Sequence, residues 1–268
     1  MEYKITSGFV VEVRRSWLPG RERGTERRRG TRIAGNTSEK KIKSNETEAV
    51  KQLARILNCN VRKNWMFVTA KFDEAHLPSD RDGLKKMISR YLKAVRAAFK
   101  AEHGRNPRYI YVLGTWSVKH DRPARFHLHL VIEPCSADML RSLWQGGGSV
   151  ICEDIDNRQD HTALAVYLYK NTERTERGEC RWSTSRGNLD KPIYTEPVEV
   201  SDVEGIDKIP GSVMMDMSRL DDEDGNPISA YIRCVLPVRP RVRGGQLIIP
   251  KAPKRGGRKG GDTDGEDI

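Results

Sequence analysis

The hydrophobic and polar positions in the middle of the chain follow the periods of strands and helices. Residues 65–70 are a short, apolar, β-prone run, which is typical of a buried strand. Apolar residues then recur every three or four positions over residues 84–99, which predicts an amphipathic helix. We expect this helix to begin after Ser79 or Asp80 and to end at Gly104.

Five further segments continue this pattern. Strands are predicted at residues 109–113, 126–132 and 149–152, and helices at 136–144 and 160–170, the last one capped by Asp160. The order β-α-β-β-α-β plus one helix is that of a ferredoxin-like split βαβ fold. The sequence therefore predicts an α+β domain over residues 50–190, with an antiparallel sheet and helices on one face.

The segments on either side of this domain have little periodicity. Residues 1–45 are rich in Arg, Gly, Ser and Thr, which predicts a mostly flexible basic arm with one candidate short strand at residues 10–13. Residues 191–238 are acidic, and we expect a partly ordered extension there. Residues 239–268 form a basic tail rich in Gly and Pro that ends in acidic residues.

The net charge indicates a polyanionic partner. The chain has 268 residues, with 48 Lys and Arg against 37 Asp and Glu, which gives a net charge of +11 and a pI near 9.5. Much of the positive charge lies in the two arms, including the run Arg27-Arg28-Arg29. This distribution predicts nucleic-acid binding in which the arms supply affinity that does not depend on sequence.

Three features predict an intracellular protein. No stretch approaches 18 consecutive apolar residues, so no membrane span is expected. The N-terminus lacks the basic-then-apolar pattern of a signal peptide. The five cysteines are odd in number and have no CxxC spacing, which is typical of reduced thiols. We therefore expect a cytoplasmic location.

Two histidines alternate with leucines in the strand predicted at residues 126–132. His127 and His129 point to the same face of that strand, whereas Leu128 and Leu130 point to the other face. Two imidazoles at this spacing can bind one divalent ion and leave positions for a phosphate oxygen. The alternative is that both are ordinary surface histidines, but the strongly apolar opposite face favours a distinct polar site.

A tyrosine and a lysine share one face of the last predicted helix. Tyr167 and Lys170 are three residues apart, whereas Tyr169 points roughly opposite Tyr167. A nearby ammonium favours the phenolate form of a tyrosine, and a metal that polarises a phosphate reduces the nucleophilic strength required. The alternative is a tyrosine at the edge of the core with a solvent-directed lysine. Together with a metal held by the histidines, the pair could transfer a DNA strand to tyrosine.

These residues resemble the motifs of the HUH endonuclease superfamily, in particular its single-tyrosine rolling-circle replication initiators from phages and plasmids. Phe67-Val68-Thr69 resembles the first strand motif, His127-Leu128-His129 the HUH motif and Tyr167-Leu168-Tyr169-Lys170 the Tyr-x-x-Lys motif. Residues 181–187, Arg-Trp-Ser-Thr-Ser-Arg-Gly, resemble the stretch that follows this helix in replication-associated proteins.

The resemblance implies a metal-dependent DNA endonuclease and strand transferase. Tyr167 would attack a phosphodiester of a single-stranded or hairpin origin, which leaves a 5′-phosphotyrosine link and a free 3′-OH. His127 and His129 would hold Mg²⁺ or Mn²⁺, and Lys170 would orient the phosphate or stabilise the phenolate. A host helicase or polymerase is a possible partner. The expected DNA contacts are Arg181, Arg186, Lys119, Arg125, Arg27, Arg28 and Arg29.

The sequence departs from the family pattern at the third metal ligand. Many relatives have Glu or Gln on the preceding strand, where this chain has Trp116-Ser117-Val118. The candidates for a replacement ligand are His120, Asp121 and His76. The two-residue spacing of Tyr167 and Tyr169 also differs from the four-residue spacing of two-tyrosine relatives, which favours a single nucleophile.

Three functions remain open on the sequence alone. A replication initiator is favoured, and the same chemistry could serve a transposase or a relaxase. The missing acidic ligand leaves a further alternative, a non-catalytic DNA-binding or regulatory protein that keeps the fold.

Overall fold

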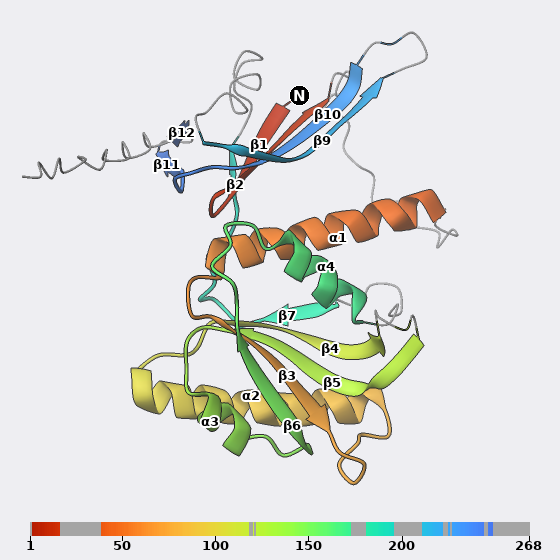
Figure 1. The fold of residues 1–268 in the computed structure, drawn as a ribbon, viewed down its shortest axis with the longest axis vertical. Helices are drawn as coiled ribbons and strands as arrows, with labels where there is room; N and C mark the ends of the chain where they lie inside the picture. The colour runs from red at the N-terminus through yellow and green to blue at the C-terminus, as the bar shows by residue number, and fades with distance from the viewer. Residues whose placement is uncertain are drawn as a thin grey trace, which may run out of the picture.

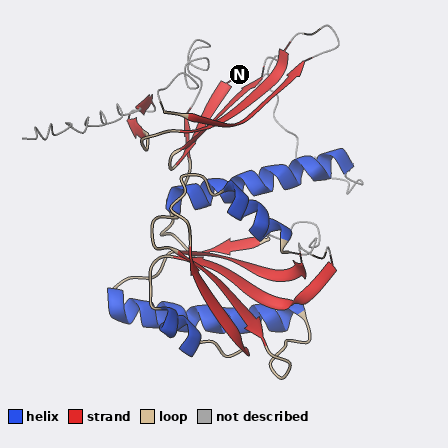
Figure 2. Ribbon diagram, in the orientation of Figure 1, coloured by secondary structure: helices blue, strands red, loops and turns tan. Residues whose placement is uncertain are grey.

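The computed structural model describes residues 2–16, 39–117, 120, 122–172, 181–195, 211–221, 225, 227–243 and 246–248. Two five-stranded antiparallel sheets are separated by helices (Figures 1 and 2). A short pair, β11 (Arg241–Arg243) and β12 (Gln246–Ile248), lies beside the second sheet. The predicted α+β class is confirmed.

The central sheet carries the predicted elements. Its strand order is β6 (Gly147–Asp154), β3 (Met66–Phe72), β5 (Arg122–Ile132), β4 (Tyr109–Ser117) and β7 (Trp182–Thr184). All neighbouring strands in it are antiparallel. Along the chain these strands alternate with α2 (Arg81–His103), α3 (Ala137–Ser142) and α4 (Thr162–Lys170) in the predicted order.

Local capping explains where two of the helices begin and end. Asp80 accepts a hydrogen bond from the Gly83 amide at 2.7 Å, and Gly104 adopts a φ of 71° after the last turn of α2. Ser136 likewise accepts from the Met139 amide at the start of α3. Both helices pack on one face of the sheet, where α2 buries Ile88 and its neighbours against a layer that includes Leu128 and Leu130.

The opposite face of the sheet is also covered, so the prediction of helices on one face is wrong. The helices α1 (Glu39–Asn60) and α4 lie on that face (Figure 1). Leu57 of α1 and Leu168 of α4 pack there against Val112 and Val131. The central strands carry apolar residues at consecutive positions, as expected for strands buried on both sides.

The start of α4 differs by one position from the prediction. His161 occupies the cap position and makes no side-chain cap hydrogen bond. Asp160 lies one residue earlier, and its Oδ1 still accepts from the Thr162 amide at 3.0 Å. The same carboxylate also holds Arg233 of the second sheet at 2.7 Å.

A second sheet forms from segments that are distant in the sequence. Its order is β8 (Ile193–Thr195), β1 (Glu2–Ser7), β2 (Val10–Ser16), β10 (Pro227–Val235) and β9 (Val213–Asp221). The prediction of a flexible arm over residues 1–45 is therefore wrong for residues 2–9, 14–16 and 39–45, whereas the candidate strand at residues 10–13 lies within β2. The acidic segment at 191–238 supplies three strands of this sheet.

A buried ion pair connects the second sheet to α1. Glu12 of β2 accepts two hydrogen bonds of 2.7 Å from the Arg55 guanidinium, and Tyr231 of β10 donates to the same carboxylate at 3.0 Å. Both partners of the pair are almost fully buried. Removing either partner of such a pair strongly destabilises the fold, since the remaining charge would be buried alone.

Two further sequence expectations can be compared with this structure. Cys59, Cys135, Cys152 and Cys234 are free thiols, and Cys180 lies outside the described residues. Within the described ranges, no helix has the length and apolar character needed to span a membrane.

Candidate active site

The strand β5 directs its two histidines toward α4 and its leucines toward α2. His127 lies opposite Lys71 of β3, and His129 lies opposite Thr69. On the other side, β4 places Gly114 opposite His127. The predicted alternation is therefore confirmed, and it puts both imidazoles on the face that α1 and α4 cover.

The ring nitrogens of the two histidines converge. The Nε2 atoms of His127 and His129 are 3.0 Å apart. Nδ1 of His127 is 2.8 Å from the carbonyl oxygen of Arg125, an interaction in which Nδ1 donates, so the Nε2 lone pair is available. Nδ1 of His129 is 3.2 Å from Oγ1 of Thr69. At this separation either a proton or a metal ion can lie between the two Nε2 atoms.

This separation fits two ligands of one octahedral ion. Nitrogen ligands about 2.1 Å from a metal and 90° apart are separated by about 3.0 Å. Burial lowers the pKa of His127, and it lowers the pKa of His129 to about 3 with a further contribution from the charge of His127. Both imidazoles are consequently neutral at neutral pH, which is the form that binds metals.

Tyr167 lies beside this pair of histidines. Its ring centroid is 5.5 Å from that of His129 and 5.9 Å from that of Phe67, which itself stacks on His129 at 5.2 Å. The Tyr167 side chain is 43% exposed. Tyr169 faces away, is buried, and packs near Trp182. The structure thus brings Tyr167, but not Tyr169, to the histidines.

Asn171, which no sequence pattern singled out, connects the tyrosine helix to the histidine site. Its Nδ2 donates to the carbonyl oxygen of Tyr167 at 2.7 Å, and its side chain also interacts with His129, where it partly offsets the lowering of the pKa. Its own carbonyl oxygen accepts from the amides of Thr115 and Trp116 at 3.0 Å. One residue therefore joins α4, β4 and β5.

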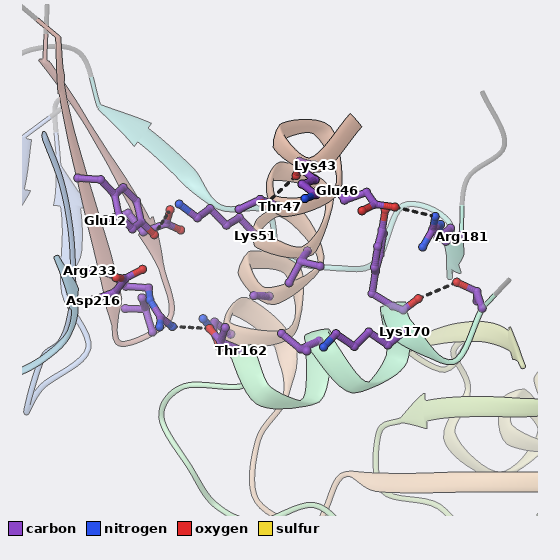
Figure 3. A pocket seen from close by; sticks show the side chains of 18 of the residues that line it. Glu12, Lys43, Glu46, Thr47, Lys51, Thr162, Lys170, Arg181, Asp216 and Arg233 are labelled. Atoms are coloured by element: carbon purple, nitrogen blue, oxygen red, sulfur yellow. Dashed lines mark hydrogen bonds and ion pairs between the residues drawn. The ribbon is translucent and has the colours of Figure 1, made fainter. Parts of the chain in front are cut away.

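The position of Lys170 differs from the sequence-based expectation, and Lys71, for which no role was predicted, is opposite His127. Lys170 is exposed and lines a cavity of about 1000 Å³ between α1, α4 and the second sheet (Figure 3); Tyr167 does not line that cavity. Lys71 is the cation whose charge acts on both histidines. The sequence signal for Lys71 was its alternation with Thr69, but the predicted strand ended at residue 70.

The candidates for a third metal ligand are not brought to the histidines. His76 is in the loop after β3, where its Nδ1 is 2.7 Å from Oδ1 of Asp73. His120 is exposed, and Asp121 lies outside the described residues. Within the described ranges, no group of three His, Cys, Asp or Glu side chains is arranged to hold a metal.

The backbone at Gly114 excludes a third metal ligand at one further position. A Cβ atom at this position would lie 2.2 Å from Nε2 of His127. The position on the preceding strand that directly faces His127 therefore cannot carry a side chain while the ring stays in place. The residues present fit a metal held by two imidazoles, with the remaining positions left to substrate and water.

The arginines expected to contact DNA have different environments. Arg125 is exposed on the same side of β5 as His127, and Arg186 is exposed after β7. Arg181 packs over the ring of Tyr169 at 4.2 Å and lies 3.3 Å from Glu46, so it is mainly a packing residue. Lys119, Arg27, Arg28 and Arg29 lie outside the described residues.

Comparisons with protein-family models, curated proteins and solved structures found no significant match.

Proposed function

We propose that the protein is a rolling-circle replication initiator that nicks DNA through a metal-assisted transfer to Tyr167. The observation that carries this proposal is the convergence of His127, His129 and Tyr167 on one face of the central sheet. These residues come from two elements about 40 positions apart, and they meet where the side chain of Tyr167 is exposed to solvent.

The topology of the central sheet supports the finer assignment to a ferredoxin-like HUH fold. Four strands lie in the order β6-β3-β5-β4 with antiparallel neighbours, which is the arrangement of a split βαβ unit. The histidines are on a central strand of that unit, and the tyrosine helix follows its last strand. The extra sheet formed by both ends of the chain is an addition to this unit.

His127 and His129 would hold the divalent metal, with Mg²⁺ or Mn²⁺ as our proposal. When bound, the ion would polarise the scissile phosphate and neutralise part of its charge. Thr69 and the Arg125 carbonyl orient the two rings, as residues around metal ligands commonly do. Lys71 supplies a positive charge beside them for the same phosphate.

In the proposed transfer, Tyr167 is the nucleophile and the 3′ oxygen of the DNA is the leaving group. The Tyr167 oxygen forms a bond to phosphorus while the bond from phosphorus to the 3′ oxygen breaks. The phenol proton passes to solvent, which reaches the exposed Tyr167 side chain. The departing 3′ oxygen takes up a proton and becomes the 3′-OH that a polymerase can extend, and the 5′ phosphate stays on Tyr167.

A transposase or relaxase would use the same site, and only the DNA substrate would distinguish these functions. A non-catalytic DNA-binding protein is a second candidate. It is favoured by the lack of a third ligand with the histidines among the described residues. In that case the two buried histidines would only form a hydrogen bond that stabilises the fold.

The test is a nicking assay on a supercoiled plasmid that carries the origin, with Mn²⁺ or Mg²⁺. We expect a covalent protein–DNA adduct that is lost in Tyr167→Phe and in His127→Ala. Tyr169→Phe is the matched control, since it removes the same hydroxyl two residues away and should keep the adduct. Salt-sensitive DNA binding without an adduct from any form would support the binding protein instead.

A further inference from the structure

The largest cavity described lies beside α4, on a different side from the histidines. It is lined by α1, α4, strands of the second sheet, Trp116 of β4 and the residues Thr172 and Arg181. In Figure 3, Glu46 of α1 points toward Arg181, and Lys170 extends along α4 into the same space. A volume of about 1000 Å³ is large enough for a nucleotide.

The charges at this cavity favour an anionic ligand. Five lysines and arginines line it against three carboxylates. Two of the carboxylates are already used, because Glu12 pairs with Arg55 and Glu46 pairs with Arg181. Within the described parts of the chain, Lys43 and Lys170 line the cavity without forming an ion pair. Two cations are thus available for a phosphate group.

Aromatic surfaces also line the cavity. Trp116 and Tyr169 both contribute, and the guanidinium of Arg181 covers the Tyr169 ring at 4.2 Å. Flat aromatic and guanidinium surfaces are where unpaired bases stack. The combination of lysines with such surfaces suits a nucleotide better than a simple anion or an apolar molecule.

The cavity is also close to the candidate active site along the chain. Trp116 follows Gly114, which faces His127, by two residues in β4. Lys170 follows Tyr167 by three residues in α4. Asn171 connects β4 to α4, because its carbonyl accepts from Thr115 and Trp116 and its side chain donates to Tyr167. A single DNA strand whose phosphate lies at Tyr167 could therefore place a neighbouring nucleotide in the cavity.

From these contacts we infer that the cavity is a nucleotide-binding subsite for the strand next to the scissile phosphate. Lys43 and Lys170 bind its phosphate, and Trp116 stacks on its base. The inference rests on the proposed function for the choice of the DNA strand. The role of Lys170 is then to position the strand, and it differs from direct activation of Tyr167.

The test measures binding of a fluorescent single-stranded oligonucleotide to the full chain carrying Tyr167→Phe, so that no cleavage is needed. In this background, Trp116→Leu is expected to weaken binding by about 5-fold or more, and Trp116→Phe to restore most of it. Lys43→Gln should weaken binding a few-fold, whereas Lys93→Gln, an exposed lysine on α2, should have little effect. Thermal melting shows whether each variant is folded.

A second arm titrates the same proteins with a free deoxynucleoside monophosphate. Binding that depends on Trp116 in this arm would support the subsite with a free nucleotide as its occupant. Equal oligonucleotide binding by all the variants, together with no mononucleotide binding, would overturn the inference. These results are separate from the nicking assay, which can fail while binding at the cavity is retained.

A third measurement locates the bound base directly. An oligonucleotide that contains 5-iodouracil is crosslinked to the Tyr167→Phe protein by ultraviolet light, and the attached peptides are identified by mass spectrometry. We expect crosslinks in the peptides that contain Trp116 or Tyr169. Crosslinks confined to other parts of the chain would contradict the proposed location.

Discussion

Individual residues of the candidate site act through neighbours that come from other strands. The imidazole of His129 is held by Thr69 and Asn171 and is packed between Phe67 and Tyr167. The separation of its Nε2 from that of His127 depends on these contacts as well as on strand alternation. Substitutions at these neighbouring residues are therefore expected to change metal binding and the rate of adduct formation.

Replacing Lys71 by Gln should have opposite effects on metal binding and on DNA cleavage. Its charge lowers the pKa of both histidines, and the same repulsion acts on a divalent cation. We expect Mn²⁺ to bind about two- to tenfold more tightly and adduct formation to become slower. Calorimetry and single-turnover assays measure the two effects, and Lys71→Arg should restore both values. Weaker Mn²⁺ binding would contradict this role.

Asn171→Ala should slow the transfer step and leave DNA affinity nearly unchanged. The change removes the hydrogen bond to the Tyr167 carbonyl and the interaction with His129, so the nucleophile loses its fixed position. We expect adduct formation to slow by about 10- to 100-fold and stability to fall by about 1–3 kcal/mol. Asn188→Ala is the control, because it also removes partly buried hydrogen bonds of a side-chain amide. Equal rates in the two variants would assign Asn171 a purely structural role.

At the scale of elements, the register between β4 and β5 makes room for the histidines. Gly114 is directly opposite His127, and the Lys71 side of the ring is occupied by β3. A bulge follows Gly114 before Trp116 pairs with Pro123. The pairing register of β4 with β5, more than the residue types in them, thus places the His127 ring against a residue that has no side chain.

Gly114→Ala should therefore displace His127 without unfolding the sheet. The added methyl would lie 2.2 Å from Nε2, and the ring must move away. We expect Mn²⁺ affinity to fall by at least about tenfold, together with a loss of adduct. Gly83→Ala in the first turn of α2 is the control, because its Cβ would meet nothing closer than Oδ1 of Asp80 at 3.2 Å. Unchanged Mn²⁺ affinity in Gly114→Ala would show that His127 does not bind the metal.

At the scale of the whole molecule, several buried histidines connect stability to pH. Burial lowers the pKa of His127, of His161 and, to about 3, of His129. The unfolded chain takes up protons at these sites near pH 6.5, whereas the folded chain does not. Their contribution to stability is fully present above pH 6.5 and is lost as the pH falls from there toward 3.

Urea unfolding of the metal-free protein between pH 8 and pH 4.5 measures this dependence. We expect the free energy of unfolding to decrease steadily below about pH 6.5. The variant His129→Gln should show a smaller decrease, because one of the titrating groups is gone. A free energy that stays constant down to pH 4.5 would contradict the neutral, buried state of these histidines.

The ends of helices and the alternation of side chains in strands could be predicted because they depend on residues that are near neighbours in the chain. The capping of α2 by Asp80 and Gly104 and the alternation of His127 with Leu128 follow from backbone geometry. The prediction was wrong where partners are distant. The candidate strand at residues 10–13 is the start of β2, but its continuation through Arg14 and Arg15 and its pairing with β10, more than 200 residues away, were not predicted.

The sequence by itself determined the main elements of the central sheet, the shared face of the two histidines and the opposite directions of Tyr167 and Tyr169. These properties arise from the periods of strand and helix, which need no knowledge of the rest of the fold. Only the tertiary structure decided that helices cover both faces, that Lys71 lies at the histidines and that Lys170 lines the cavity. Those facts depend on strand order, register and the packing of α1 and α4, which bring together residues that no local pattern connects.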